Sequence, residues 1–388
     1  MSKKFQNYNK SSKFDFITYG IIIVAFIAVS LLSSQGILGR SHQGLLVPAC
    51  CYIVMAISLN LTVGVLGELS LGHAGFMSVG AFTGIVVSMS LQNSVPFVPV
   101  RLGIAMLAAA VMAGIAGIII GIPVLRLRGD YLAIVTLAFG EIIKDLINSL
   151  IVGVDSRGLH IIFNFRGNKS TADLHLLDGG TEIIKGAQGA TGTEKIATFT
   201  AGFVLIMVSL IIVLNLVRSR TGRAVLAIRE NRIAAEACGI NLMKYKMTAF
   251  AVSAAIAGAA GALYGLNYSN LVASKFDFNT SILILVFVVL GGLGNMLGSV
   301  IAAAVLYILP EALRGFADYR MLIYAIVLIL VMLATNNAKL RALFEKIIPR
   351  RKNGGIKKDQ NGSRPEQFNN SRKGSWKNSC NRVQSSWN

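Results

Sequence analysis

The sequence has few charged residues and few cysteines for its length. Charged side chains make up 14% of its 388 residues, whereas hydrophobic ones make up 54%. A soluble chain of this length would form two or three domains with charged surfaces, and this composition argues against that class. The four cysteines, two of them in one apolar run and two far apart in basic segments, match neither a disulfide framework nor metal-ligand spacing. We therefore expect no redox chemistry and no metal site.

Common catalytic and nucleotide-binding motifs are also absent. The sequence contains no G-x-x-x-x-G-K-[ST], H-E-x-x-H, G-x-S-x-G or C-x-x-C pattern. Without the first of these there is no loop to hold nucleotide phosphates. We expect no cofactor and no enzymatic activity in this chain, and any process driven by ATP would need a second chain for hydrolysis.

Long apolar runs are abundant. An α-helix needs about 20 apolar residues to cross roughly 30 Å of hydrocarbon. The sequence predicts an all-α, polytopic transmembrane helical bundle with about 8–10 membrane segments, some broken or re-entrant. Residues 3–13 are lysine-rich, but the apolar stretch after them is long for a signal peptide and no convincing cleavage site follows, so we expect a retained first span. The eight clearest segments are 16–34, 44–66, 74–91, 102–123, 131–152, 198–217, 247–269 and 320–335.

The positive charges indicate the orientation of the spans. The net charge is +19, but the basic residues lie between and after the apolar runs rather than on one folded face, so we expect no nucleic-acid partner. Short cytoplasmic loops collect lysine and arginine. This rule places 1–15 and the loop 218–246 in the cytoplasm and the polar segment 153–197 outside, as a small cap or loop.

A ninth apolar region, 281–309, is interrupted by glycines. If it crossed the membrane once, the tail 337–388, with 13 Lys and Arg against 3 Asp and Glu, would lie outside. If it breaks at the glycines and returns, the basic tail lies in the cytoplasm. We favour the broken form because it satisfies the charge rule and explains the glycines. The tail itself, poor in aliphatic residues after Arg350, is expected to be disordered.

Polar residues at membrane depth mark the first of three motifs, 60–76. Non-helical backbone is tolerated there only where protein or a water-filled cavity satisfies it, and broken segments often line substrate paths. A weak echo between 71–81 and 293–303 suggests duplicated halves that flank the pathway. The alternatives are a tight helix contact in which His73 forms a hydrogen bond with a neighbouring carbonyl, and a Glu68 that simply faces the cytoplasm. The candidate pathway residues are Asn60, Glu68, Ser70, Gly72, His73, Gly75, Gly292, Gly294 and Asn295.

The second and third motifs carry charges. In the second motif, 125–143, Asp130 is placed to cap the following helix. Glu141 lies three residues before Lys144, just past the motif, and this spacing allows an ion pair, either within the membrane or near the outer surface as a packing contact.

In the third motif, 220–240, a short amphipathic helix ends at Gly239. It would suit a docking helix for a cytosolic protein or, alternatively, a basic helix lying on headgroups.

Together the motifs resemble one known family. The stretches NLTVGVLGELSLGHAGF, LRLRGDYLAIVTLAFGEI, GRAVLAIRENRIAAEACGIN, AFAVSAAIAGAAGALYG and VLGGLGNMLGSVIAAAVLYILPE are similar, in order, to the LivM-type permease subunits of branched-chain amino acid ABC importers. The resemblance implies a multi-pass cytoplasmic-membrane permease with a second homologous permease subunit, two cytosolic ABC ATPase subunits and an extracytoplasmic substrate-binding protein. It also implies that a coupling loop docks on an ATPase through Arg229, Glu230, Ala235, Glu236 and Gly239.

Two features of the sequence depart from the family pattern. The fifth span lacks a Thr-Gly-Gly-x-x-Gly-Ile run after it, and the basic tail is long. A related permease for urea, short amides or another small solute is the nearest alternative. A membrane enzyme or receptor without transport is a more distant one.

Overall fold

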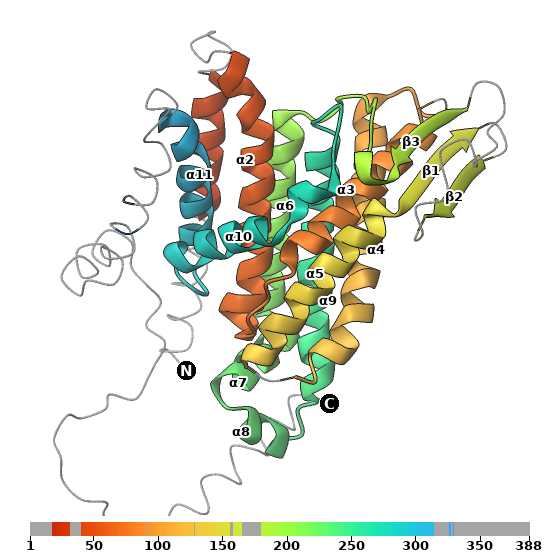
Figure 1. Ribbon diagram of the computed structural model, residues 1–388. Helices are drawn as coiled ribbons and strands as arrows, with labels where there is room; N and C mark the ends of the chain where they lie inside the picture. Colours follow the sequence, from red (N-terminus) through yellow and green to blue (C-terminus); the bar gives the residue numbers. More distant parts are fainter. Residues whose placement is uncertain are drawn as a thin grey trace, which may run out of the picture.

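The computed structural model describes residues 18–31, 40–92, 94–127, 129–155, 158–164 and 180–313, together with 326 and 329. Predictions for 1–15, for the tail and for most of the span 320–335 lie outside these residues. The described part is a bundle of helices with a small sheet at one end (Figure 1). The expected polytopic helical fold is confirmed, since five helices are long and apolar enough to cross a membrane.

The helices follow the apolar runs closely. The five candidate spans are α2 with its continuation η1, and α3, α4, α6 and α9. The bounds are Thr18–Leu31 for an unlabelled first helix, then α2 Arg40–Leu59, η1 Asn60–Leu66, α3 His73–Ser90, α4 Val98–Val124, α5 Asp130–Asn148, α6 Phe199–Arg218, α7 Arg220–Glu230, α8 Arg232–Ala237, α9 Leu242–Gly265, α10 Phe278–Gly291 and α11 Met296–Ala312, with short 3₁₀ turns at Gly186–Gln188 and Ala273–Phe276.

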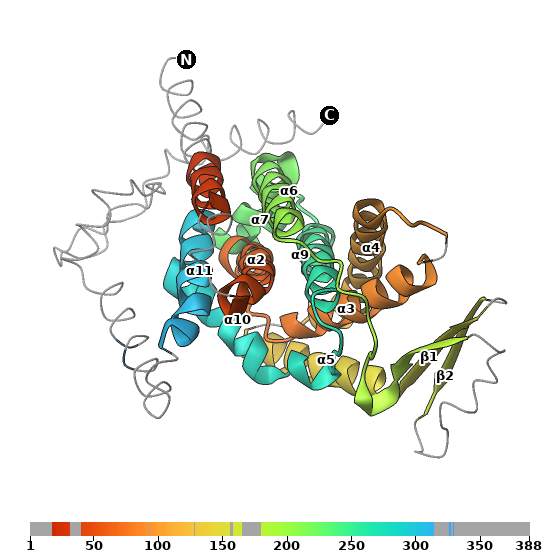
Figure 2. The ribbon, with the colours of Figure 1, turned by 90° about the horizontal axis from the view of Figure 1, so that it is seen from above.

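Small residues hold the centre of the bundle together. Helix α9 lies between α2, α3, α4 and α6 when the bundle is seen from above (Figure 2). Its Gly258 approaches α4 so closely that an added Cβ would lie 2.3 Å from the Cβ of Ala113, and on α3 an added Cβ at Gly80 would lie 2.1 Å from the Gly258 carbonyl oxygen. Such close backbone approach is how helices gain van der Waals contact in a membrane, where apolar burial alone drives little association.

The large apolar side chains of α4 face outward instead. Leu107 and Ile119 are 70% and 65% exposed, whereas Ala105, Ala109 and Ala113 are fully buried against the bundle. This division of one helix into a small-residue face and a large apolar face is the arrangement expected for a helix in contact with lipid.

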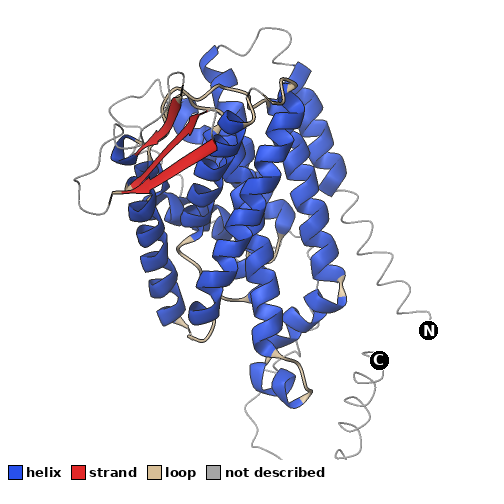
Figure 3. Cartoon of the chain, turned by 90° about the vertical axis from the view of Figure 1, so that its right-hand side faces the viewer, coloured by secondary structure: helices blue, strands red, loops and turns tan. Residues whose placement is uncertain are grey.

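The polar segment after α5 forms a sheet rather than only a loop. Strands β1 (Leu150–Asp155), β2 (Gly158–Phe163) and β3 (Thr181–Lys185) pair antiparallel in the order β2-β1-β3, with Gly153 of β1 opposite His160 of β2. The span predicted to end at 152 therefore ends at Asn148, where its chain turns into β1. The strands lie at one end of the bundle (Figure 3), opposite the short helices α7 and α8 (Figure 1).

The ninth apolar region is split at its glycines into two helices, which confirms the predicted break, while the predicted return to the cytoplasmic side stays a prediction. Helix α10 lies across the bundle and α11 lies along it (Figure 1). At about 1.5 Å per residue, neither the 14 residues of α10 nor the 17 of α11 would span about 30 Å. Gly292 and Gly294 make the turn between them with φ angles of 93° and 81°, a conformation in which glycine avoids steric strain.

Candidate functional site

A π-helical segment interrupts the first broken span. From Asn60 to Leu66 the helix widens into η1, and all seven of its residues are buried. Gly67 then adopts a left-handed conformation with a φ of 81°, and the chain runs without regular structure until α3 begins at His73. π-Helical turns are frequent at functional sites because they displace backbone carbonyls from the regular ladder.

The two interruptions meet. The side-chain amide of Asn60 donates to the hydroxyl of Ser299 at 2.8 Å, and its carbonyl oxygen accepts from the backbone N–H of Gly294 at 2.8 Å. Gly64 lies so close that an added Cβ would be 2.3 Å from the Gly294 nitrogen. We call η1 together with the turn Gly292–Asn295 the break junction. Of the predicted pathway residues, Asn60, Gly292, Gly294 and Asn295 belong to it, with Asn295 capping α11 by accepting from Gly298.

A residue of the predicted coupling loop reaches this junction. The guanidinium of Arg229, on α7, donates to the carbonyl oxygen of Gly64. Its aliphatic stem covers Gly67, where an added Cβ would lie 2.9 Å from the Arg229 Cγ, and its Nη1 lies near Gly294. One side chain therefore bonds one half of the break junction and lies near the other.

The other predicted coupling residues lie farther along the loop. Ala235 is buried in a small apolar cluster with Ile228 and Leu242, which fixes α8 against the start of α9. Glu230 and Glu236 are exposed, and Gly239 makes the turn after α8 with a φ of 80°. The loop predicted as 218–246 thus contains α7, α8 and the first residues of α9.

Glu68 is paired rather than open to a pathway. It forms an ion pair with Lys246 of α9, and the two side chains are only 16% and 6% exposed. From the sequence alone, Lys246 was one of several basic residues in the predicted loop. The structure places it in the first turns of α9, where its ammonium pairs with Glu68 of the non-helical segment.

His73 lies in a fully buried cluster of hydroxyl groups. Its Nε2 is 2.8 Å from the Oγ of Ser58, which itself donates to the backbone carbonyl of Ser253 at 2.6 Å. The Oγ of Ser253 donates to the Ser58 carbonyl at 2.7 Å and accepts from Thr62 at 2.8 Å. When the Ser58 hydroxyl donates to the Ser253 carbonyl, the hydrogen between Ser58 and His73 lies on Nε2, which is also 3.4 Å from the Oγ of Ser253.

This cluster was mostly missed from the sequence. His73 was singled out, but Ser58, Thr62 and Ser253 are single hydroxyls within apolar helices and give no signal of their own. The expected alternative for His73, a hydrogen bond to a neighbouring carbonyl, is replaced by one to a hydroxyl. Its Nδ1 has no hydrogen-bond partner among the described residues.

Gly72 and Gly75, in the first of the two echoed segments, do not belong to the break junction. An added Cβ at Gly72 would lie 2.0 Å from the Thr136 carbonyl oxygen, and one at Gly75 would lie 3.0 Å from the Gly140 Cα, so both pack on α5. Ser70 is buried, and within the described residues its hydroxyl has no partner. These residues position α3 against α5.

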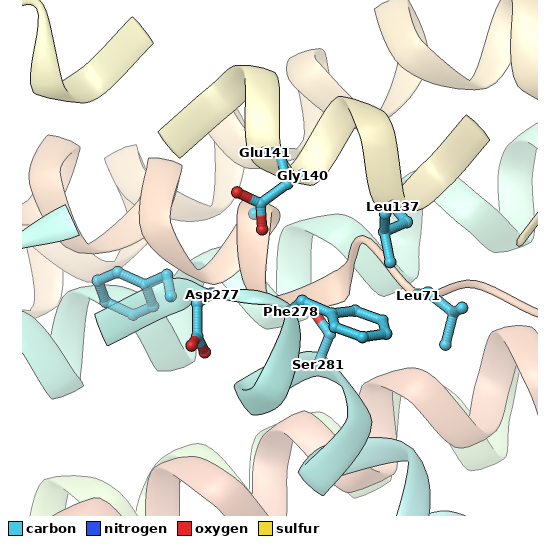
Figure 4. Close-up of a pocket in the computed structure, with 9 residues that line it drawn as sticks. Leu71, Leu137, Gly140, Glu141, Asp277, Phe278 and Ser281 are labelled. Atoms are coloured by element: carbon cyan, nitrogen blue, oxygen red, sulfur yellow. The ribbon is translucent and has the colours of Figure 1, made fainter. Parts of the chain in front are cut away.

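A small pocket lies beside this contact, between α3, α5 and α10. Figure 4 shows the carboxylates of Glu141 and Asp277 close to it, with the aliphatic side chains of Leu71 and Leu137 on another side. Glu141 forms the expected ion pair with Lys144.

The cap position before α5 is Gly129, one residue earlier than predicted, and Asp130 is the first helical residue.

This fold and site define a multi-pass helical membrane protein in which two broken helices meet beside a loop helix. The chain belongs to the family described as branched-chain amino acid transport system / permease component, whose model matches residues 42–332. No solved structure matches.

Several named proteins are similar to this chain. It is 34% identical over 295 residues to the high-affinity branched-chain amino acid transport system permease protein LivM of Salmonella typhimurium, covering 73% of this chain and 66% of that one. The protein of the same name from Escherichia coli is 33% identical over the same shares. A probable branched-chain amino acid transport permease protein LivM of Methanocaldococcus jannaschii is 27% identical over 69% of this chain and 79% of its own length. The chain thus matches just under two thirds of the first two relatives.

Proposed function

We propose that this chain is the membrane-spanning permease subunit of an ATP-binding cassette importer that translocates the branched-chain amino acids leucine, isoleucine and valine across the cytoplasmic membrane. Membership of the permease family and the names of its relatives support the substrate class. The observation that carries the mechanism is the contact of Arg229 with the break junction. This contact joins a loop helix at one end of the bundle to the point where two apolar segments are interrupted.

The partners follow from this proposal. The chain would pair with a second, homologous permease subunit and receive substrate from an extracytoplasmic binding protein at the sheet end. The importer would hold two cytosolic ABC ATPase subunits, and the α7–α8 end of this chain would dock on an ATPase. The basic residues of α7 support a cytoplasmic position for that end, and with it a cytoplasmic N-terminus. Ile233 on α8 is 81% exposed and suits burial in an ATPase surface.

The mechanism is mechanical rather than chemical. ATP-driven closure of the ATPases would move α7 and α8, and Arg229 would carry that movement to Gly64 and Gly294. The break junction would then open between outward and inward states, with its backbone groups available to the polar ends of an amino acid. The chain forms no covalent intermediate, and the energy comes from its partners.

Different observations support the proposed pathway residues. Asn60, Gly292, Gly294 and Asn295 are supported by their meeting at the break junction, and His73 by its buried hydroxyl cluster next to it. Ser70, Gly72 and Gly75 are supported only by their place in the non-helical segment and the start of α3.

Discrimination among the three aliphatic substrates would rest mainly on the binding protein. One methylene in an apolar pocket is worth only about 1–3 kcal/mol. A permease that accepts all three needs an apolar path and a few polar groups for the shared ammonium and carboxylate.

Uptake by the reconstituted complex tests the proposal. Vesicles that contain both permease subunits, the ATPases and the cognate binding protein are supplied with ATP and either labelled leucine or labelled urea. ATP-dependent accumulation of leucine but not urea supports the proposal. Accumulation of urea without leucine would assign the chain to the alternative substrate class, and no accumulation of either would remove the transport proposal.

A further inference from the structure

A cleft of about 690 Å³ lies at the α7–α8 end of the bundle. It is bounded by the end of α4, by α8 and by the first turns of α9, and it is separate from the break junction. Arg126, Arg232, Glu236 and Lys246 carry its charges. Its volume is many times the roughly 30 Å³ that one water takes up in the liquid.

Two of these charges are uncompensated. Lys246 is neutralised by Glu68. Within the described part of the chain, neither Arg126 nor Arg232 has an ion-pair or hydrogen-bond partner. The cleft therefore holds two guanidinium groups against the one carboxylate of Glu236, and it favours an anion that can also accept several hydrogen bonds.

One side of the cleft continues into the lipid-facing surface. Arg126 follows the end of α4 at Val124 by two residues. The preceding turns of α4 expose Ile118, Ile119 and Ile122 at 44%, 65% and 47%. An anion bound at Arg126 could therefore extend directly along an apolar helix face.

We propose that this cleft binds the headgroup of an anionic phospholipid. The phosphate would lie between Arg126 and Arg232, a headgroup hydroxyl would donate to Glu236, and the acyl chains would lie on the exposed isoleucines of α4. Basic clefts between membrane helices on the cytoplasmic side suit this class of ligand. The bound lipid would bridge α4, in the bundle, to α8, in the loop.

The apolar continuation favours a lipid over free phosphate, which would use the charges alone. Glu236 and Gly239, which the family resemblance placed in ATPase docking, line this cleft and would face the lipid instead. The ATPase contact would use Ile233, which projects from a different face of α8 from Arg232 and Glu236. The cleft would bind this lipid whichever solute the permease carries.

Binding of short-chain lipids to the full-length chain in neutral detergent tests the proposal. Native mass spectrometry counts the adducts formed with dioctanoyl phosphatidylglycerol, with dioctanoyl phosphatidylcholine and with inorganic phosphate. We expect tight binding of phosphatidylglycerol only. Arg126→Gln and Arg232→Gln should each weaken it by about five-fold, as expected for one arginine near an anionic surface.

The matched control is Arg220→Gln. Arg220 is exposed at the same end, on α7, but does not line the cleft. It should leave binding unchanged, and Arg126→Lys with Arg232→Lys should retain most of it, which also shows that substitutions here leave the chain folded. Equal binding of the two lipids, an equal effect of phosphate, or an equal loss in Arg220→Gln would each overturn the proposal.

Discussion

Replacing Arg229 with methionine removes the guanidinium group but keeps an unbranched stem over Gly67. In the structure that guanidinium donates to the carbonyl oxygen of Gly64 and lies near Gly294. The change therefore separates the polar link between the coupling loop and the break junction from the apolar packing of the same side chain.

The size of the effect follows from the bond that is lost. A hydrogen bond from a charged donor is worth about 1.5–3 kcal/mol, and the partial exposure of Arg229 places it at the lower end. A loss of about 1–2 kcal/mol changes a conformational equilibrium by roughly 5- to 30-fold. If Arg229 transmits the movement of α7, the amount of leucine carried per ATP should fall by about that factor while ATP hydrolysis continues.

Two assays measure this effect. The ratio of labelled leucine accumulated to phosphate released, in vesicles that hold the complete importer, reports coupling. Hydrogen exchange of residues 60–67 in the purified chain reports the junction alone, because local opening accelerates exchange in proportion to its population. We expect faster exchange in Arg229→Met even without partners.

Arg223→Met is the control, since Arg223 lies on the same helix and its guanidinium, among the described residues, donates to the carbonyl of Arg218 at 3.0 Å and not to the break junction. It should leave both readouts unchanged. Wild-type exchange at 60–67 in Arg229→Met would refute the structural argument. Changed exchange with unchanged coupling would refute only the role of Arg229 in transmission.

Three further substitutions test other parts of the structure. Gly258→Leu should lower the thermal unfolding temperature markedly, because its Cβ would already lie 2.3 Å from the Cβ of Ala113 on α4. Gly103→Leu is the control and should not lower it, because nothing lies within 4 Å of an added Cβ there. Equal unfolding temperatures of the two variants would contradict this packing. Glu68→Gln should lower the free energy of unfolding by about 3 kcal/mol, because it leaves Lys246 buried without its partner. In a denaturant titration, adding Lys246→Met to this variant should recover part of that loss. Additive losses from the two substitutions would argue against the ion pair. Gly239→Pro, at a φ of 80° that proline cannot adopt, should abolish coupled uptake while membrane insertion measured by protease protection stays intact; normal uptake would exclude the docking role of this loop.

Much of the helical architecture was predictable because a membrane imposes length and apolarity on each span. The split at Gly292 and Gly294 was predictable for a related reason, since neighbouring glycines inside a long apolar run weaken a continuous helix. For the spans and for this break, local sequence and the membrane constraint agree, so both can be predicted without knowing any tertiary contact.

The contacts between distant segments were not predictable. Ser253 and Ser58 are 195 residues apart, and nothing in either span indicates that they face each other. The π-helical form of η1 likewise depends on tertiary contacts, since Asn60 bonds residues of the second break. The sheet at 150–185 was missed because its strands are five or six residues long and lie in a polar, glycine-containing segment.

The hydroxyl cluster around His73 has a consequence for proton leakage. A chain of hydroxyls conducts protons only if each member can accept one and pass another onward. When the Ser58 proton points to the Ser253 carbonyl and the Ser253 proton points to the Ser58 carbonyl, both hydroxyl protons end on backbone oxygens, with His73 and Thr62 as donors to the two hydroxyls. Carbonyl oxygens have no proton to release. In this arrangement the buried hydroxyls close on backbone acceptors and form no continuous relay for protons.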